Sequence, residues 1–492
     1  MAHGPALVIA LPFLGAFVCG WMGSRRIGFA RWGAVGTAAI HAFIALSLLS
    51  RVTRNGPLTY ATGGWPAPLG IEVRVDILGA VVLTLLGCGA TLILLFAQSH
   101  EPAELGRQAE RWYWPLCLTL LGGMSGLVIA KDLFNLFVMA EICSIAACGI
   151  ISVDSRPAAL EASFKYLLLS AVGSGAVLLA TAMLYSVTGY LDMDAISRAL
   201  PAAAASFPRV TMGALALYLV GFGLKAALFP LHVWLPDAHS AAPSASSALL
   251  SGLVVKVYVV ALARIGYQVW GPDLLWRSPA PYVMFWFSAG AMFFGSIVAI
   301  AQRDIKRLLA YSTIAQMGYI FFGLSLRSEN AVAGALLHVF NHAVMKVCLF
   351  LAAGAMIART GKRDLAGLSG IARSMPLTTA AFTIGALAMI GVPGTNGFIS
   401  KWYVALGALD LGRPLYAVLV VASSLLSGAY YLPFVISAYF GPDPGHPRGR
   451  EGPPAELAPI VILAAVCVLT GFLPRFPLQH MLEVAKSFFA LR

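Results

Sequence analysis

The chain has 492 residues, of which 59% are hydrophobic and only 11% are charged, and its formal net charge is +12. A soluble domain contains about 25% charged residues, so this composition excludes an ordinary soluble protein and predicts a membrane protein that crosses the bilayer many times. The basic residues are dispersed over short loops, which favours anionic lipid headgroups over nucleic acid as their partner.

About fourteen segments have the length and apolar character of a transmembrane helix. In chain order they are 6–22, 30–49, 76–97, 113–130, 132–152, 161–187, 211–228, 243–265, 281–301, 308–326, 330–358, 376–391, 397–439 (one helix with a preceding half-helix) and 456–473. Because a helix satisfies its backbone hydrogen bonds within lipid, we expect an all-α polytopic membrane protein.

The charges of the loops predict the orientation. Arg25, Arg26 and Arg31 follow the first span, and no Lys or Arg precedes it, so this span does not have the pattern of a signal peptide. Basic loops tend to remain in the cytoplasm, and the loops at 303–307 and 359–373 support the same orientation. With an even number of spans, we expect a multi-pass protein of the cell inner (plasma) membrane with both termini on the outer side.

Three segments are expected to lie outside the helix bundle. Residues 50–75 contain Gly63, Gly64 and Pro66 and are typical of an extended or hairpin loop. Residues 440–456 are rich in Gly, Pro and charge, which predicts a linker. Residues 478–490 place apolar side chains on one helical face, so we expect a short amphipathic helix on the lipid surface or docked on a neighbour.

Two of the predicted spans are interrupted in the same manner. Pro230 and Pro236 break the seventh span shortly after Lys225, and residues 391–394 (GVPG) break the twelfth shortly before Lys401. Proline removes a backbone donor, and irregular backbone at membrane depth is tolerated only inside protein or beside water. Paired breaks are typical of transporters with inverted repeats, whose sites lie at the breaks. Two ordinary proline kinks are the alternative.

The spacing of the breaks predicts the organisation of the chain. They lie about five spans apart, and an odd offset inverts the orientation of a repeat in the membrane. We therefore expect three N-terminal helices with their loops in 1–112 and a first inverted repeat (spans four to eight) in 113–265. A second repeat (spans nine to thirteen) would occupy 280–440, and 441–492 would hold the linker, span fourteen and the amphipathic helix.

Five charged side chains interrupt the apolar spans. A charge near the bilayer centre costs on the order of 2.5–3.5 kcal/mol on insertion scales, so such residues usually face a bundle interior and mark an ion or proton route. The five residues are Glu141, Lys225, Lys256, Lys346 and Lys401. Their presence predicts an ion-translocating protein, and purely structural charges are the alternative.

Glu141, Lys225 and Lys256 receive the most specific roles. Glu141 has no acidic residue within several turns, so it is suited to pair with Lys225 and to exchange that pairing during turnover. Burial disfavours the charged form of a lysine, so that a buried lysine can release its proton. Lys256 lies in the middle of its span, too far from any loop to snorkel, and we interpret it as the central proton carrier.

Histidines accompany the lysines in the second half of the chain. His338, His342 and Lys346 are spaced four residues apart and share one helical face, so the stripe can bridge two lysines with the help of water. Lys401 would be the terminal carrier on that half. The two histidines also have the spacing of metal ligands, but no HExxH motif or third ligand lies nearby, so no metal is expected.

Three further polar residues are supporting candidates. His232 and His239 lie in the first break, where each would either hydrogen-bond the irregular backbone or act as a proton relay. Lys165 opens the sixth span beside Glu161 and would tune Glu141 rather than carry protons itself.

No cofactor site is indicated. The seven cysteines lie in or beside apolar spans without a CxxC pair, and the chain contains neither a GxGxxG after a strand nor a phosphate-binding GxxxxGK[ST] loop. No catalytic site of its own is recognisable, so the ions must be driven by a gradient or by a partner protein. The chain would be part of an enzyme only as a proton-pumping subunit of a redox complex.

Four segments together resemble the antiporter-like, proton-conducting subunits of respiratory complex I, Mrp-type cation/proton antiporters and membrane-bound hydrogenases. The segments are 132–141 (DLFNLFVMAE), 225–239 (KAALFPLHVWLPDAH), 310–319 (AYSTIAQMGY) and 338–346 (HVFNHAVMK). The resemblance covers roughly residues 110–440. It implies fourteen helices, two inverted five-helix repeats, broken helices seven and twelve, and both termini outside.

The resemblance also implies roles for matching residues. Glu141 and Lys225 would form the charge pair, Lys256 would be the central lysine and Lys401 the outlet, and His338 would lie on the polar axis. Within the family, 374–382 (SMPLTTAAF) and 397–403 (GFISKWY) are most similar to the D-type subunit of Mrp-type antiporters. Two features depart from that branch: Pro393-Gly394 stands where many relatives have a second proline, and 229–237 (FPLHVWLPD) is more similar to complex I and hydrogenase relatives.

We therefore expect a proton-translocating subunit of a multisubunit membrane complex that exchanges protons against sodium, as the D-type subunit of an Mrp-type Na⁺/H⁺ antiporter does. The alternative is the same channel in a respiratory NADH–quinone oxidoreductase or a membrane-bound hydrogenase complex. In either case its partners would be other membrane subunits and lipid. A self-contained solute transporter is a weaker hypothesis because the midplane offers lysines rather than a varied polar pocket. A non-conducting scaffold would not need five charges within the membrane.

Overall fold

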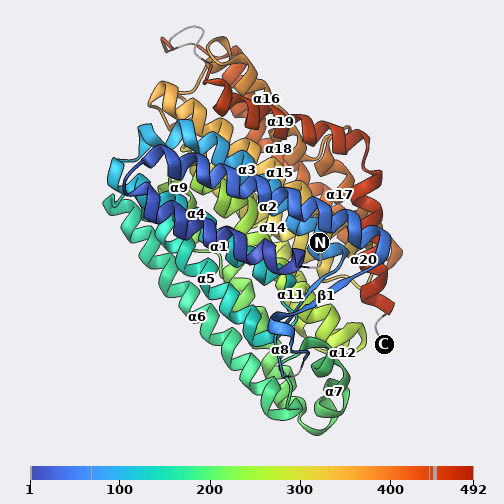
Figure 1. Ribbon diagram of the computed structural model, residues 1–492. Helices are drawn as coiled ribbons and strands as arrows, with labels where there is room; N and C mark the ends of the chain where they lie inside the picture. The colour runs from blue at the N-terminus through green and yellow to red at the C-terminus, as the bar shows by residue number, and fades with distance from the viewer. Residues whose placement is uncertain (1–2, 68, 443, 447–450, 491–492) are drawn as a thin grey trace.

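The computed structural model describes residues 3–67, 69–442, 444–446 and 451–490, and it consists almost entirely of helices (Figure 1). By length and composition alone, eleven of the described helices could cross a membrane. The remaining helices of the bundle are shorter or more polar, and several of them belong to broken pairs. The prediction of an all-α polytopic membrane protein is confirmed.

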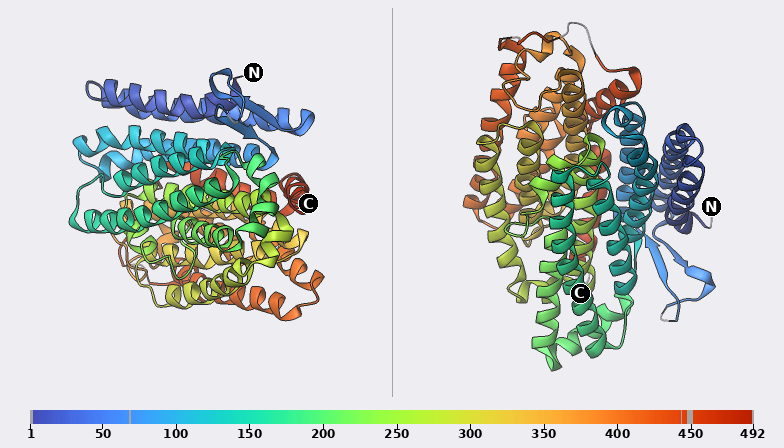
Figure 2. Two further views of the ribbon diagram at one scale, coloured as in Figure 1. Left: turned by 90° about the horizontal axis from the view of Figure 1, so that it is seen from below. Right: turned by 90° about the vertical axis from the view of Figure 1, so that its left-hand side faces the viewer.

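The first part of the chain is a series of helices joined by short connections. They are α1 (Gly4–Gly23), α2 (Ile27–Asn55), α3 (Ile77–Glu104), α4 (Arg107–Ile129), α5 (Leu133–Ile151), α6 (Pro157–Thr188), α7 (Met193–Ser206), α8 (Pro208–Lys225) and α9 (Leu235–Ala241). α1 and α2 form an outer layer that covers α3 and α4 (Figure 2).

The eighth predicted span is one long element with two π-helical turns. It consists of α10 (Ser244–Leu249), the π-helical turn η2 (Leu250–Val254), α11 (Val255–Arg264), the π-helical turn η3 (Ile265–Trp270) and α12 (Gly271–Arg277). Periodicity alone did not predict the π turns, because each adds only one residue to a helical turn.

The second part continues the bundle. Its helices are α13 (Ala280–Ile300), α14 (Ile305–Leu324), α15 (Glu329–Thr360), the short 3₁₀ turn η4 (Ile371–Arg373), α16 (Pro376–Ile390), α17 (Asn396–Asp410), α18 (Pro414–Phe440), α19 (Pro454–Phe472) and α20 (Arg475–Ala490). α15 is buried along most of its length, with α3, α10, α14, α16, α17, α19 and α20 packed around it. Side chains on its inner face are therefore shielded from lipid.

The fourteen predicted spans all fall on helices or on broken helix pairs, and both predicted breaks are present. Helix α7 was missed, although its buried residues Met193, Ile196, Leu200 and Ala203 follow the spacing of an amphipathic helix. It packs against α8 and η3 at the same end of the molecule as the β-hairpin (Figure 1). The predicted end of the third span was also too early, since α3 continues to Glu104.

Residues 50–75 include the predicted hairpin. β1 (Leu58–Ala61) pairs antiparallel with β2 (Glu72–Val75), and the 3₁₀ turn η1 (Thr62–Gly64) follows β1. Residue 68 of this segment lies outside the described residues. Lys131, in the turn between α4 and α5, holds the hairpin through an ion pair with Glu72 at 2.8 Å and also pairs with Asp192 at 3.4 Å. This contact was not predicted from the sequence.

The hairpin contact should depend on pH. The hydrogen bond from Lys131 outweighs burial and lowers the pKa of Glu72. Burial tends to lower the pKa of Lys131, but its bonds to Glu72, Asp192 and Asp194 outweigh this and raise it. A carboxylate with a lowered pKa stabilises the fold above its unfolded pKa of about 4.3, and the stabilisation is lost as the pH falls through the folded value.

We expect hydrogen–deuterium exchange protection of the β1 and β2 amides to decline as the pH falls below about 4.3, the unfolded pKa of a glutamate, and to be lost once the pH passes the lowered pKa of Glu72. The Glu72→Gln variant should show weaker protection at neutral pH and little further loss in acid. An equal loss of protection in acid for both proteins would contradict the role of the ion pair.

Two turns at corresponding places share an unusual backbone feature. Asp132 forms an isolated antiparallel bridge with Asp192, and Asp304 forms one with Asp364, with the same chain separation in both cases. Asp132 caps α5 by accepting from Asn135 N, and Asp304 caps α14 by accepting from Arg307 N. The long helices enclosed by the bridges, α6 and α15, have 32 residues each.

The C-terminal helix α20 is amphipathic, as predicted. It buries Met481, Val484, Ala485 and Phe488 against α15, α3 and α12, and the ring of Phe488 stacks on Tyr267 at 5.0 Å. Of the two predicted placements, the structure has the helix docked, on its own bundle. The predicted linker at 440–456 connects α18 to α19, and residues 443 and 447–450 of it lie outside the described residues.

Candidate functional site

The first helix break places Lys225 in the middle of the bundle. α8 ends at Lys225, residues 226–234 form turns, and α9 resumes at Leu235. The break leaves the last carbonyl groups of α8 without helical partners. Trp234 compensates for one of them, since its indole Nε1 donates to Leu224 O at 2.9 Å. The end of α8 is thus stabilised inside the protein.

Lys225 pairs with Glu141, as predicted from the sequence. Its Nζ lies 3.2 Å from Glu141 Oε1, and it also donates to Ser144 Oγ at 2.6 Å and Ser170 Oγ at 3.0 Å. The Lys225 side chain is 1% exposed, whereas that of Glu141 is 32% exposed. Ser174 also donates to Glu141. The lysine therefore keeps hydroxyl partners even if the carboxylate turns away.

Two glycines allow α6 and α8 to approach closely at this pair. A Cβ atom placed on Gly221 would lie 2.6 Å from Gly173 O, closer than real Cβ contacts. Glycine at both positions therefore permits the backbone approach that brings Ser170 of α6 to Lys225 of α8.

Lys256 is buried in the centre of the bundle, directly after the first π-helical turn. Its Nζ donates to Ser251 O, five residues earlier, a carbonyl that lies in η2. Ser251 in turn shares a hydrogen bond with Thr313 of α14, with 2.8 Å between the hydroxyl oxygens. π-helical turns often occur at functional sites. Here the altered hydrogen-bond pattern supplies a neutral oxygen for the lysine.

Lys346, on α15, is held by α14. Its Nζ donates to Leu309 O at 2.6 Å and to the hydroxyl of Ser312. Ser312 also shares a hydrogen bond of 2.8 Å with Tyr431 OH of α18. The lysine is therefore connected to a neutral polar network that links three helices.

His338 and His342 form the predicted stripe on the face of α15 that also carries Lys346. Their rings are stacked with centroids 5.8 Å apart. His338 Nδ1 lies 2.8 Å from Ser400 Oγ, and its Nε2 lies 2.9 Å from Gln316 Oε1. Both ring nitrogens of the buried His342 have no hydrogen-bond partner among the described residues.

Lys401 lies directly after the second break. α16 ends at Ile390, Gly391 adopts a φ of 89°, and α17 begins at Asn396. The Lys401 Nζ donates to Met389 O at 2.7 Å and to Ile390 O at 3.2 Å. The terminal carbonyls of a helix carry partial negative charge, so they are suitable partners for a cation. Lys401 thus interacts with the end of the broken helix that precedes it.

His338 and Lys401 are connected through one glutamine. Gln316 Oε1 of α14 accepts from His338 Nε2, and Gln316 Nε2 donates to Met389 O at 3.3 Å, the carbonyl that Lys401 also contacts. Gln316 lies in the 310–319 segment but received no role from the sequence. The serine, threonine and glutamine partners were all missed, although uncharged polar residues within apolar spans are a usable signal.

Together these residues form what we call the buried axis. It comprises Glu141, Lys225, Lys256, Lys346, His342, His338 and Lys401. Hydrogen bonds join six of its members in three groups, at Glu141 with Lys225, at Lys256 and Lys346 beside α14, and at His338 with Lys401. His342 makes a ring contact with His338 instead. Tyr258 lies between the first two, because Lys225 Nζ is 5.6 Å from its ring and it follows Lys256 by two residues on α11.

Over the described ranges of the chain, two of the supporting candidates, Lys165 and His232, make no ion pair or ring contact with the axis residues. Lys165 is half-exposed and forms ion pairs with Glu161 at 2.7 Å and Asp237 at 3.2 Å, rather than with Glu141. His232 lies in the first break, where its ring stacks on Phe229 at 5.3 Å. Among the described residues, no three His, Cys, Asp or Glu side chains gather where they could hold a metal ion.

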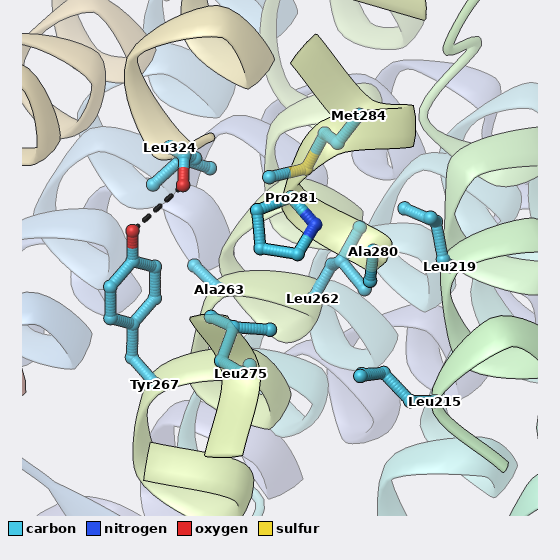
Figure 3. Close-up of a pocket in the computed structure, with 11 residues that line it drawn as sticks. Leu215, Leu219, Leu262, Ala263, Tyr267, Leu275, Ala280, Pro281, Met284 and Leu324 are labelled. Atoms are coloured by element: carbon cyan, nitrogen blue, oxygen red, sulfur yellow. Dashed lines mark hydrogen bonds between the residues drawn. The ribbon is translucent and has the colours of Figure 1, made fainter. Parts of the chain in front are cut away.

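An apolar pocket lies between α8, α11 and α13, and its lining is chemically different from the axis (Figure 3). Leu215 and Leu219 of α8, Leu262 of α11, and Pro281 and Met284 of α13 line it. Its polar feature is the Tyr267 hydroxyl, which donates to Leu324 O at 2.7 Å (Figure 3). Apart from that hydroxyl, a lining of this kind offers no polar partners for an ion.

Comparisons with known proteins agree with the geometry. The family described as "NADH:quinone oxidoreductase/Mrp antiporter, TM" matches residues 130–427. The N-type subunit of the NADH-quinone oxidoreductase of Desulforudis audaxviator is 36% identical over 98% of both chains. The D-type subunit of the Na⁺/H⁺ antiporter of Alkalihalophilus pseudofirmus is 30% identical over 98% of this chain and 97% of the relative.

A solved structure extends the similarity to the whole fold. A chain of the membrane-bound sulfane sulfur reductase, an archaeal respiratory membrane complex, superposes with a TM-score of 0.91 at 29% identity, over 99% of this chain and 97% of that chain. The family resemblance inferred from the four sequence segments is confirmed. The chain belongs to the NADH:quinone oxidoreductase/Mrp antiporter transmembrane family.

Proposed function

We propose that the chain is a proton-translocating subunit of a multisubunit membrane complex and that protons move along the buried axis. The observation that supports this best is how the lysines are held. Lys256, Lys346 and Lys401 are buried and donate to carbonyl and hydroxyl oxygens. Within the described part of the chain, Glu141 is the one carboxylate that pairs with an axis lysine. A lysine whose partners are neutral can be either protonated or unprotonated. A lysine in a purely structural ion pair stays protonated, because the carboxylate stabilises its charge.

The pair Glu141–Lys225 would control the first transfer. When Glu141 contacts Lys225, its negative charge favours the protonated lysine. When Glu141 turns away, Ser144 and Ser170 keep Lys225 in place without stabilising its charge to the same degree. The lysine then releases its proton toward Lys256, and protons continue through Lys346, His342 and His338 to Lys401.

We propose that two inverted repeats, 113–265 and 280–440, form the two halves of this route. The matching bridges at Asp132 and Asp304, the equal lengths of α6 and α15, and the two broken helices support this organisation. Residues 1–112 and 441–492 would flank the repeats. We further propose that the loops carrying Arg156, Lys306 and Arg363 face the cytoplasm, which places both termini outside.

The driving force distinguishes two candidate complexes. In the first, the chain acts as the D-type subunit of an Mrp-type Na⁺/H⁺ antiporter, as 374–382 and 397–403 suggest. In the second, partner subunits with redox chemistry drive it. One finding favours the second: the quinone oxidoreductase subunit is more identical than the antiporter subunit, at 36% against 30%. The fold does not separate the two, since a chain of the sulfane sulfur reductase superposes with a TM-score of 0.91 and a chain of an Mrp complex with 0.90.

The test is proton flux in vesicles that contain the chain with its native partner subunits. We expect Lys225→Met and Glu141→Gln each to lower the flux by about 10²-fold, because each removes a proton-transfer group. The exposed Lys486→Met, on α20, serves as a matched control. Flux under a sodium gradient supports the antiporter, and flux only with a redox substrate supports the second complex. Unchanged flux in both axis variants would contradict the proposed site.

A further inference from the structure

A second group of ionisable residues lies where α3 ends, outside the buried axis. His100, Glu101 and Glu104, which we call the α3 cluster, are on one face of the last turns of this helix. Glu101 is completely buried, whereas the Glu104 side chain is 29% exposed. The predicted third span ended before these residues, so they were not among the sequence candidates. The cluster therefore extends from a partly exposed residue, Glu104, to a buried one, Glu101.

The two carboxylates bind the segment that joins α9 to α10. Glu104 Oε2 accepts from Ser244 N at 3.2 Å, and Glu101 Oε1 accepts from Ala245 N at 3.0 Å. His100 Nε2 lies 3.6 Å from Glu104 Oε2. The second oxygen of Glu101, Oε2, has no hydrogen-bond partner among the described residues although it is buried. Buried polar atoms normally have a partner, ordered water included, so this oxygen indicates a hydrated region.

Basic residues surround the same segment. Lys306 is buried and donates to Ala242 O at 2.5 Å. Arg156 donates to Ala241 O at 3.1 Å, and Arg363 donates to Ser240 O at 2.8 Å. These cations compensate the negative charge of the two carboxylates, but none of them forms an ion pair with Glu101. Its Oε2 atom therefore remains available for a proton.

His239 lies on α9, next to the α9–α10 segment that the α3 cluster binds. It is completely buried on α9, and both of its ring nitrogens lack a partner among the described residues. Its ring is 6.0 Å from that of Phe350, and Lys346 Nζ is 5.8 Å from the same Phe350 ring. Ser247 of α10 donates to His239 O at 2.7 Å. His239 therefore lies beside the segment that Glu101 and Glu104 bind, and it shares the Phe350 ring with Lys346.

We propose that Glu104 and Glu101 form the port through which protons pass between one membrane surface and the buried axis, with His239 as the connection. This inference rests on the proposed function. A proton from water binds the Glu104 carboxylate and is passed to Glu101, either directly or through water. Glu101 then gives it to a ring nitrogen of neutral His239, and the imidazolium gives it to the neutral amine of Lys256 or Lys346. Each step breaks one O–H or N–H bond and forms another, and each carboxylate returns to its charged form.

The port would lie on one side of the membrane only. The loops near it contain Arg156, Lys306, Arg307, Arg359 and Arg363, so the positive-inside rule assigns this surface to the cytoplasm. Flux should therefore depend on Glu101 most strongly when the pH is varied on that side.

The experiment compares Glu101→Gln and Glu104→Gln in the complete complex with its native partners. Glutamine keeps an oxygen that accepts from Ala245 N or Ser244 N, so the backbone contacts at α10 persist while the exchangeable proton is lost. We expect Glu101→Gln to lower proton flux by about tenfold or more and Glu101→Asp to restore part of it. The matched control is Glu110→Gln, a buried carboxylate at 2.5 Å from Arg31 at the start of α4. It should retain normal flux.

The outcomes separate this inference from the proposed function. If Glu141→Gln stops flux and Glu101→Gln leaves it at the level of the unmodified complex, the port is wrong and the axis stands. If neither variant changes flux, the proposed function itself fails. If the complex with Glu101→Gln does not assemble, the Glu104→Gln variant, at a partly exposed position, is measured instead. Slower flux with an altered pH profile on the cytoplasmic side supports the port. An unchanged profile overturns it.

Discussion

The Lys256→Met variant is expected to abolish proton flux through the complex while leaving its assembly intact. Methionine is similar to lysine in length and is apolar, so it fits the buried position. It has no amine and therefore cannot carry a proton. Lys256 donates to Ser251 O within the π-helical turn, and that carbonyl loses only one neutral hydrogen bond. We expect a loss of about 10²-fold or more, measured as proton flux in vesicles.

The Lys256→Arg variant tests why the lysine is needed. Arginine keeps the positive charge but does not lose its proton in proteins, so flux should remain absent if Lys256 carries protons. If Lys256 only supplied a fixed charge, arginine would preserve flux. The exposed Lys486→Met, on α20, should behave as the unmodified protein does. Normal flux in Lys256→Met would show that protons bypass the centre of the axis.

The Asp76→Asn variant is expected to destabilise the folded chain by up to about 3–5 kcal/mol, because the buried Arg264 would lose the carboxylate that balances its charge. Arg264 of α11 binds Asp76 with two hydrogen bonds, from Nη1 at 2.7 Å and from Nη2 at 2.6 Å. Asp76 also caps α3 by accepting from Gly79 N at 2.7 Å. Asparagine is an equally good helix cap, so the variant removes the charge and keeps the cap.

The measurement is the midpoint of thermal unfolding, with the exposed pair Arg327–Asp273 as the matched control. The two side chains of that pair are 54% and 63% exposed, so Asp273→Asn should change stability by no more than about 1 kcal/mol. A clear fall of the midpoint for Asp76→Asn and none for Asp273→Asn supports the role of the buried pair. Equal midpoints for the two variants would contradict it.

The sequence was sufficient to predict the charged residues of the axis, because an ionisable side chain in an apolar span is costly enough to stand out. It was also sufficient to predict that Glu141 and Lys225 pair, and in the structure their Nζ and Oε1 atoms lie 3.2 Å apart. It did not predict the partners of the other lysines. Ser251 O, Leu309 O and Met389 O are backbone atoms, and the residue type says nothing about which carbonyl faces a cation.

Residues that combine across distant helices were also missed. Asp76 and Arg264 lie near the ends of two predicted spans, where either could have snorkelled to water, so neither stood out. Glu101 and Glu104 followed the predicted end of the third span and resembled an ordinary loop. The structure extends α3 to Glu104 and places both carboxylates against the start of α10.

By itself, the amino-acid sequence determined the membrane class, the helices, the two breaks and the identity of the charged residues. Each of these follows from a local property, because apolar length, proline and a buried charge act on the segment that contains them. Only the tertiary structure decided how the axis is connected, since hydrogen bonds between helices depend on which faces pack together. The same holds for His239, which packs against the Phe350 ring of α15 in a part of the bundle where α9 lies beside α14.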